Sequence, residues 1–531
     1  MSSALQIVGI RAVGERSILV ELPGLNEVLS LQAFLLEKPD QGQVDVVAAA
    51  ETVLVTASSK AAATRISQRI RQAELVTDHA RNDAVVVIDA VYDGVDLAEA
   101  AALAGLTPEA LVAMHSQQLW TAAFTGFAPG FAYLVSDGKY PPIPRRSSPR
   151  TSVPAGSVAM AGRYSAIYPG ESPGGWHLIG RTSAPMWLPE RSSPALVNPG
   201  NRVQFRPVRE IVAVQAAPSA VAPVSPAVVV RSPGLQTTIQ DLGRPGFAGV
   251  GVTGSGALDR AALRRANRLV GNGSGDAGLE TVLGGLELVA VQDQVMAVTG
   301  APAPVSITAA TGEQRRQAGN TPFALMAGER MSLGQPTSGF RSYVAFRGGL
   351  NVPQVVSSRS TDMLSGTGPA PLGPDTALLV GRPSRSSVVG NPEAPVPPPG
   401  DITVFRFVPG PRSDWFTQEA AVSLAEQVWV ISPSSNRIGL RLDGNPLERA
   451  KKGELTSEGT VNGAIQIPPS GLPVFFLADH PVTGGYPVIG VVIDSDLDKA
   501  AQLGPGAKIR FQSVPDAGPV PVLPQHLPHH F

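Results

Sequence analysis

The sequence predicts a mainly β protein with α+β elements, organised in several domains. Of its 531 residues, 56 are Gly and 50 are Pro, and only 16% are charged, against about 25% in an average globular domain. Short apolar runs separated by glycines indicate strands that turn back tightly. The pattern also recurs: PGGWHLIG (173–180) aligns with TGGYPVIG (483–490), and the later segments NPGNRVQFRPV and GPGAKIRFQSV are alike. Two halves built on one plan are therefore expected.

The first half divides into two predicted units. Residues 1–85 alternate strand-like and helix-like runs, which predicts a small α+β domain with a helix from Lys60 to about Ala73. Residues 86–212 begin with a buried-type strand and then a helix from about Leu97. Thr107 and Pro108 are typical of an N-cap and a first helical turn, so a second helix is expected through His115. Glycine turns and short strands follow, which predicts a β-barrel with two helices.

The second half is predicted to follow a Pro/Ala linker at residues 213–228. Residues 229–382 contain strand-type segments and a helix within 257–270, with Asp259 near its start. A proline-rich loop is expected at 383–400, a second barrel at 401–515 and a flexible tail at 516–531.

Composition excludes several classes of protein. The formal net charge is −1 and there is no long run of one sign, so neither nucleic acid nor an anionic membrane is an expected partner. The absence of Cys excludes disulfides and thiolate metal sites. No signal peptide or long apolar run is seen, and a cytoplasmic protein is expected. No phosphate-binding P-loop, metal-spaced His pair or Gly-x-Ser-x-Gly elbow occurs, so no metal site is predicted.

The glycine-rich stretch 150–182 is the main candidate site in the first half. Its arginines could bind a carboxylate or phosphate through a bidentate guanidinium, or could form internal ion pairs. The candidates there are Arg150, Ser157, Tyr168, Gly174, Gly175, Trp176 and Arg181.

The second stretch could form an anion-binding nest from the amides of its TGGY turn, although a tight hairpin needs the same glycines. The binding candidates in the second half are Arg244, Arg437, Thr483, Gly484, Gly485 and Tyr486. His115 is either a proton shuttle or a satisfied buried histidine. Candidates for acid–base work, with capping or turn stabilisation as the alternative, are Asp241, Asp259, Glu458 and Asp479.

These motifs taken in order resemble a known family. FTGFAPGFAYL (124–134), PRTSVPAGSVAMAG and IYPGESPGGWHLIGRT are similar to allophanate hydrolase subunit 1, the family of the Kip-type inhibitor and the B subunit of 5-oxoprolinase. PGLQTTIQDLGRPGFAGVGV, SGALDRAALRRANRLVGN, SNRIGLRL and TGGYP are similar to its companion, allophanate hydrolase subunit 2 or the C subunit of 5-oxoprolinase. The resemblance covers nearly the whole chain and identifies it as a fusion of the two.

The resemblance implies one cyclophilin-like barrel in the first half and two cyclophilin-like subdomains in the second. It also implies a component of an ATP-dependent 5-oxoprolinase, an amide hydrolase that opens 5-oxoproline to glutamate with a LamB/YcsF-type partner. ATP, with Mg²⁺, is then the expected cofactor, and no biotin is expected on this chain. The alternatives are a urea-type carboxyltransferase served by a biotin-dependent partner, and a non-enzymatic Kip-type regulator of a histidine kinase. A homo-oligomer is possible under each.

Overall fold

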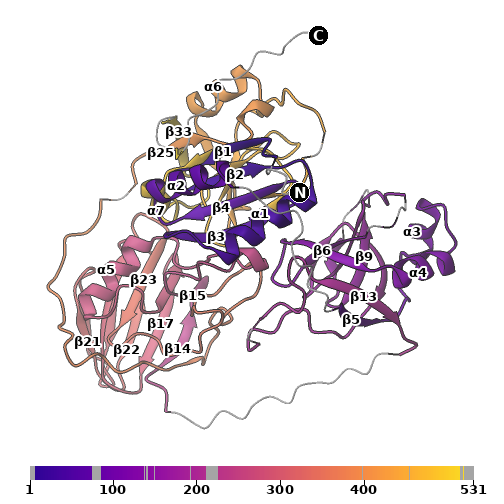
Figure 1. The fold of residues 1–531 in the computed structure, drawn as a ribbon. Helices are drawn as coiled ribbons and strands as arrows, with labels where there is room; N and C mark the ends of the chain where they lie inside the picture. Colours follow the sequence, from indigo (N-terminus) through magenta and orange to yellow (C-terminus); the bar gives the residue numbers. More distant parts are fainter. Residues whose placement is uncertain are drawn as a thin grey trace.

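The computed structural model describes residues 6–73, 85–136, 138, 141–146, 148, 150–191, 193–210, 225–397, 399–453, 455–514 and 518–519. Most of the predicted linker and tail therefore lies outside the described residues. Figure 1 shows the first barrel on one side of the molecule, with the small N-terminal domain beside the C-terminal barrel and the body that carries α5 below them.

The N-terminal domain is one antiparallel sheet in the order β1-β2-β4-β3, with two helices on one face. Its elements are β1 Gly9–Val13, β2 Ser17–Glu21, α1 Leu25–Glu37, β3 Gln43–Ala48, β4 Thr52–Ala57 and α2 Lys60–Arg71. Because side chains alternate along a strand, the sheet is apolar on both faces. Ile18 and Val20 pack toward the helices, whereas Leu19 and Leu54 join a cluster with Val488 and Val491 of the C-terminal barrel.

The first barrel is a seven-stranded sheet in the order β12-β9-β10-β7-β6-β13-β5, and a bridge between Val91 and Arg181 brings its edges together. Its strands are β5 Val85–Ala90, β6 Trp120–Thr125, β7 Ala132–Ser136, β9 Ser157–Ala161, β10 Tyr164–Ile167, β12 His177–Arg181 and β13 Arg202–Pro207. A two-stranded ribbon consists of β8 Arg150–Val153 and β11 Ser172–Gly174. The helices are α3 Leu97–Leu103 and α4 Pro108–Gln117, and the Thr107 hydroxyl caps α4 as its sequence indicates.

The body after the linker packs two sheets around an apolar core. The first sheet contains β14 Val228–Pro233, β17 Leu286–Ala290, β19 Val305–Thr308, β20 Gln314–Gln317, β22 Arg330–Leu333 and β24 Ala377–Leu378. The second contains β15 Gln236–Gln240, β16 Gly278–Val282, β18 Gln294–Gly300, β21 Phe323–Leu325 and β23 Arg341–Phe346. The 3₁₀ turn η1 Ala248–Val250 and helix α5 Arg260–Val270 complete it.

The C-terminal unit is a closed barrel in the order β25-β32-β29-β30-β27-β26-β33. Its strands are β25 Ile402–Pro409, β26 Trp429–Ile431, β27 Gly439–Asp443, β29 Ala464–Gln466, β30 Val474–Phe476, β32 Val488–Val492 and β33 Lys508–Ser513. A short ribbon pairs β28 Glu458–Gly459 with β31 Thr483–Gly484. The unit also has η2 Ser413–Trp415, α6 Gln418–Glu426 and α7 Asp494–Ala500.

The sequence repeat corresponds to a structural repeat. In each barrel the last strand pairs in parallel with the first, β13 with β5 and β33 with β25. The indole N–H of Trp120 donates to the carbonyl of His115 at the end of α4, and that of Trp429 donates in the same way to Leu424 in α6. The predicted fold class, mainly β with α+β elements, is confirmed.

The described residues include no single helix with the length and apolarity needed to cross a membrane; only α3 and α4 taken together, across an 86° bend, pass that test.

Candidate functional site between the two halves

The two glycine-rich stretches meet at one cavity of about 350 Å³. The first barrel contributes one wall and the C-terminal barrel the other, so a single site is built from both halves of the chain. Eight of the candidate residues chosen from the sequence line this inter-barrel pocket: Tyr168, Gly174, Gly175, Trp176, Thr483, Gly484, Gly485 and Tyr486.

Aromatic rings form the wall on the first-barrel side. Phe131 and Tyr133 each contact Trp176 edge-on, with ring centroids 5.7 and 5.6 Å apart, and Phe131 contacts Tyr168 at 5.2 Å. Burial raises the pKa of Tyr168 to about 12, so its hydroxyl stays protonated at neutral pH. The wall therefore offers ring faces and a neutral hydroxyl to a small ligand.

Gly174 is required by the packing of this wall. A Cβ atom at position 174 would lie 2.3 Å from the Tyr168 hydroxyl and 2.9 Å from its ring. Any side chain there would displace the tyrosine. The absence of one also lets a ligand approach the backbone of the turn.

Two cations that were not among the sequence candidates line the pocket, Arg145 and Arg146. Arg146 forms ion pairs with Asp96 at 2.9 Å and Glu99 at 3.3 Å, and its backbone N–H donates to the Gly175 carbonyl at 2.9 Å. Arg145 is exposed and has no ion pair within the described part of the chain. It is the pocket's available cation. The run PRRSSPR was the only sequence signal for it.

The two arginines favoured from the sequence have carboxylate partners outside the pocket. Arg150 forms a bidentate pair with Asp96, at 2.8 and 2.7 Å, and Arg181 donates to Asp93 at 2.9 Å. The Arg150–Asp96 pair is largely buried, whereas the Arg181–Asp93 pair lies on the surface. An anion-binding role for either arginine stays a prediction. Ser157 lies in β9 with its hydroxyl donating to the Pro154 carbonyl at 2.7 Å, and it does not line the pocket.

Arg437 and Asp479 belong to a buried network away from the pocket. Arg437 donates to both oxygens of Asp479, at 2.9 and 3.0 Å, and to Glu280 at 2.5 Å. Arg244 lies in the same region; it donates to the Ser360 carbonyl, while its Nε and one Nη have no hydrogen-bond partner among the described residues. This network joins the middle body to the C-terminal barrel.

The remaining acid–base candidates also have structural partners. The Asp241 carboxylate accepts bonds from Ser358, Ser360 and the N–H groups of Gly243 and Arg359. Glu458 pairs with Arg412, and burial raises the pKa of its carboxyl despite that partner.

His115 is fully buried beneath the first barrel. Its ring nitrogens bond to Tyr92 at 2.8 Å and Ser165 at 2.7 Å, and burial lowers its pKa to about 3. The equivalent position in the second barrel is Leu424, since each residue accepts a bond from its barrel's tryptophan. These contacts match the alternative of a satisfied buried histidine.

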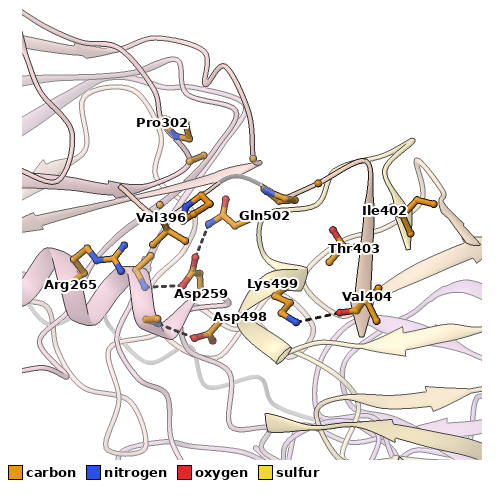
Figure 2. Close-up of a pocket in the computed structure, with 18 residues that line it drawn as sticks. Asp259, Arg265, Pro302, Val396, Ile402, Thr403, Val404, Asp498, Lys499 and Gln502 are labelled. Atoms are coloured by element: carbon orange, nitrogen blue, oxygen red, sulfur yellow. Dashed lines mark hydrogen bonds between the residues drawn. The ribbon is translucent and has the colours of Figure 1, made fainter. Parts of the chain in front are cut away.

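Asp259 lies at a second cavity of about 500 Å³, between α5, α7 and residues 396–397 and 399–404 (Figure 2). It caps α5 through a bond from the Ala262 N–H and accepts a second bond from Gln502, both at 2.8 Å. Burial raises its pKa to about 6. Asp259 is thus remote in the fold from the inter-barrel pocket and has a capping role.

No group of three or more metal-ligating side chains occurs within the ranges that the structure describes.

Two family descriptions match the chain. The family described as Carboxyltransferase domain, subdomain C and D, matches residues 8–197, and the one described as Carboxyltransferase domain, subdomain A and B, matches residues 250–513. The crystal structure of TTHA0988 superimposes with a TM-score of 0.80 at 32% identity and covers 94% of this chain and 100% of that chain. The predicted cyclophilin-like fold class agrees with these matches, while the exact number of such barrels stays a prediction.

Named relatives match each half. The chain is 36% identical over 286 residues to the C subunit of 5-oxoprolinase from Escherichia coli (strain K12), a match that spans 52% of this chain and 88% of that protein. It is 32% identical over 200 residues to the B subunit of 5-oxoprolinase from Escherichia coli O157:H7, spanning 38% of this chain and 83% of that protein. The urea amidolyase of Lachancea kluyveri is 31% identical over 310 residues, which is 53% of this chain but only 16% of that enzyme.

Proposed function

Because this chain belongs to the carboxyltransferase-domain family that includes the B and C subunits of 5-oxoprolinase, with both types in one polypeptide, we propose that it is a component of an ATP-dependent 5-oxoprolinase. In this proposal it opens 5-oxoproline to glutamate together with a LamB/YcsF-type protein. The observation that carries the proposal is the convergence of both glycine turns on one pocket with aromatic walls and an available arginine. Such a pocket suits a small, partly apolar acid.

The substrate's features match the lining. 5-Oxoproline has a carboxylate, a lactam amide and an apolar ring edge. Arg145 can hold the carboxylate through its guanidinium fork, and the faces of Trp176 and Tyr168 can cover the ring. The backbone of Gly174 and Gly484 is open to the amide. A volume of about 350 Å³ leaves room for a group transferred to the lactam.

The chemistry calls for an activating group because a lactam is an unreactive amide. ATP transfers its terminal phosphoryl group to the lactam oxygen and leaves as ADP. One water adds to the lactam carbonyl carbon and the ring C–N bond breaks, which gives γ-glutamyl phosphate; a second water hydrolyses this acyl phosphate to glutamate and phosphate. Cations stabilise the charge that spreads over the phosphoryl oxygens. In this proposal Arg145 holds the carboxylate, and Arg146, which lines the pocket while paired with Asp96 and Glu99, contributes positive charge near the phosphoryl group. We assign Mg²⁺ to the ATP phosphates.

A second candidate is carboxyl transfer to urea or a similar amide with a biotin-dependent partner. The family descriptions and the match to urea amidolyase favour it. The same pocket would serve, since Arg145 could bind a carboxylate being transferred.

The test is ATP-dependent release of glutamate from 5-oxoproline by the full chain mixed with a LamB/YcsF-type protein. We expect one ADP per glutamate, with the rate strongly reduced in Arg145→Met and retained in Arg206→Met. Arg206 is the matched control because it lies in the same barrel and pairs with Asp89 on the surface. Transfer from carboxybiotin to urea, without any glutamate release, would instead establish the second candidate.

A further inference from the structure

Asp96 and Arg412 occupy the same position in the two barrels. The N–H of Asp96 donates to the Leu178 carbonyl at 3.0 Å, and the N–H of Arg412 donates to the Val488 carbonyl at 3.1 Å. Leu178 and Val488 are aligned members of the repeat PGGWHLIG and TGGYPVIG. Each residue therefore follows the first strand of its barrel and lies against the strand that follows the glycine turn.

Arg150 and Glu458 are equivalent by the same criterion. In the first barrel, Arg150 of β8 is the register partner of Gly174 in β11. In the second, Glu458 of β28 is the register partner of Gly484 in β31. Both residues thus stand directly opposite the first glycine of a turn that lines the pocket.

These equivalent positions form ion pairs with the charges exchanged. Asp96 binds Arg150 with two bonds of 2.7 and 2.8 Å, and Arg412 binds Glu458 through its Nε at 3.0 Å to each carboxylate oxygen. The acid is on the barrel loop in the first case and on the ribbon in the second. An ion pair between the two positions is common to both barrels, but the acidic and basic residues are exchanged. A residue that binds an anionic ligand would have to be positively charged in both barrels, so the exchange favours a structural role for the pairs.

Both links are largely removed from solvent. The Asp96 and Arg150 side chains are 4% and 25% exposed, and those of Arg412 and Glu458 are 9% and 8% exposed. Each pair has a third member, since Asp96 also pairs with Arg146 and Arg412 also pairs with Glu21. Removing Arg150 or Glu458 therefore leaves a largely buried charge with one partner fewer, which weakens the link, whereas exchanging both members restores the attraction between them.

We propose that these two ion pairs are positioning devices that fix the two glycine turns on opposite walls of the inter-barrel pocket. Asp96 also accepts the Leu178 N–H at 2.8 Å. One carboxylate therefore binds both β8, which pairs with the strand that enters the turn, and β12, which follows the turn. Asp96, Arg150, Arg412 and Glu458 are positioning residues in this account and do not contact substrate. The inference rests on the proposed function only for its kinetic read-out.

The test exchanges the acidic and basic residues of the first barrel's ion pair, so that the charges match those of the pair in the second barrel. Arg150→Glu and Asp96→Arg each place like charges together, Arg150→Met only removes a charge, and the double variant Asp96→Arg/Arg150→Glu copies the pair Arg412–Glu458. Hydrogen exchange of the amides in 172–178 is measured by mass spectrometry in the full chain, with residues 202–207 as an internal reference. Arg206→Met, which breaks an exposed pair of the same barrel, is the control.

We expect each single variant to speed exchange in 172–178 by about tenfold or more, equivalent to about 1.4 kcal/mol of local stability. Exchange in 202–207 should not change in these variants. In the Arg206→Met control, exchange in 172–178 should not change. The double variant should recover part of the protection, because the ion pair is restored while the bond from the Leu178 N–H is lost and an arginine at position 96 lies beside Arg146. KM for 5-oxoproline should rise and recover in parallel with a smaller change in kcat.

Unchanged exchange at 172–178 in Arg150→Met and Arg150→Glu, or no recovery in the double variant, would overturn the inference. If exchange behaves as expected but wild type does not hydrolyse 5-oxoproline, the positioning role stands and the proposed function fails. The two failures are therefore distinguishable.

Discussion

Arg145 is the residue on which ligand binding most depends in this account. It lines the inter-barrel pocket, and no carboxylate among the described residues is close enough to pair with it. Arg150, by contrast, is already bound to Asp96. A free guanidinium beside aromatic rings is the arrangement expected for recognition of a small carboxylate.

We therefore predict that Arg145→Lys weakens binding of 5-oxoproline by about 1.5–3 kcal/mol, because lysine keeps the charge but loses the bidentate fork. The melting temperature should stay within about a degree of wild type, since an exposed side chain without a partner contributes little to stability. Calorimetric titration and a thermal melt measure the two quantities. Unchanged affinity combined with a lowered melting temperature would show a structural role.

Asp259 predicts a pH dependence of stability. Burial raises its pKa to about 6, from about 3.9 in an unfolded chain. A carboxyl whose pKa is raised by folding favours the folded state below about pH 4, and this contribution is lost as pH rises through about 6. Asn does not titrate and is also a good helix N-cap.

Asp259→Asn is accordingly expected to raise the free energy of unfolding at pH 8 by up to about 2–3 kcal/mol, seen as a higher melting temperature. At pH 4 it should have little effect. Thr417→Asn, at the N-cap of α6, changes a cap without a titrating group and should show the same difference at both pH values. An equal effect of Asp259→Asn at pH 4 and pH 8 would contradict the raised pKa.

At the scale of the elements, Arg437 joins the C-terminal barrel to the middle body. Its guanidinium binds Glu280 of β16, Asp479 after β30 and the Gly256 carbonyl before α5. All three charged side chains are at most 2% exposed. The network holds the middle body against the C-terminal barrel.

Arg437→Met should destabilise the chain by about 3–5 kcal/mol, because it leaves buried Asp479 without its cation and leaves Glu280 with Arg341 alone, at 3.4 Å. Adding Glu280→Gln and Asp479→Asn should recover part of the loss. Differential scanning calorimetry checks both, and a melting temperature unaffected by Arg437→Met would refute the structural role.

The elements that the sequence predicted best were those with local signals. Thr107 and Pro108 located α4 because capping depends on neighbouring residues alone. The glycine turns were found because close backbone approach excludes a side chain, as at Gly174 beside Tyr168.

What the sequence could not show are the contacts between distant segments. Asp96 is 54 residues from Arg150, and nothing near either residue indicates that they pair. Arg145 was not predicted as a site residue because its importance comes from having no carboxylate partner, and only the folded structure shows which charged residues lie near it. The same holds for the second wall of the pocket, which is contributed by Leu455, Ser457 and residues 483–486, far along the chain from the first wall.

At the scale of the whole molecule, the two halves are packed together. Arg16 pairs with Asp494, Glu21 pairs with Arg412, and Asp45 accepts the N–H of Ala248 at 2.9 Å. The small N-terminal domain thus lies against the second half through polar links and an apolar cluster. The first barrel contacts the same half where the Thr125 hydroxyl donates to the Gly249 carbonyl at 2.6 Å. The pocket depends on this packing.

A repeated architecture could carry either one shared site or one site in each barrel. We infer one shared site, because Trp176 and Tyr486, aligned in the repeat, line the same cavity. Each aromatic side chain should then contribute to binding of the same molecule.

Calorimetric titration of 5-oxoproline into the full chain, and into Trp176→Ala and Tyr486→Ala, tests this most directly. We predict one site per chain, with affinity lowered about tenfold or more, roughly 1.4 kcal/mol, in both variants. Two sites per chain, or a loss confined to one of the two variants, would contradict a pocket shared by the two halves.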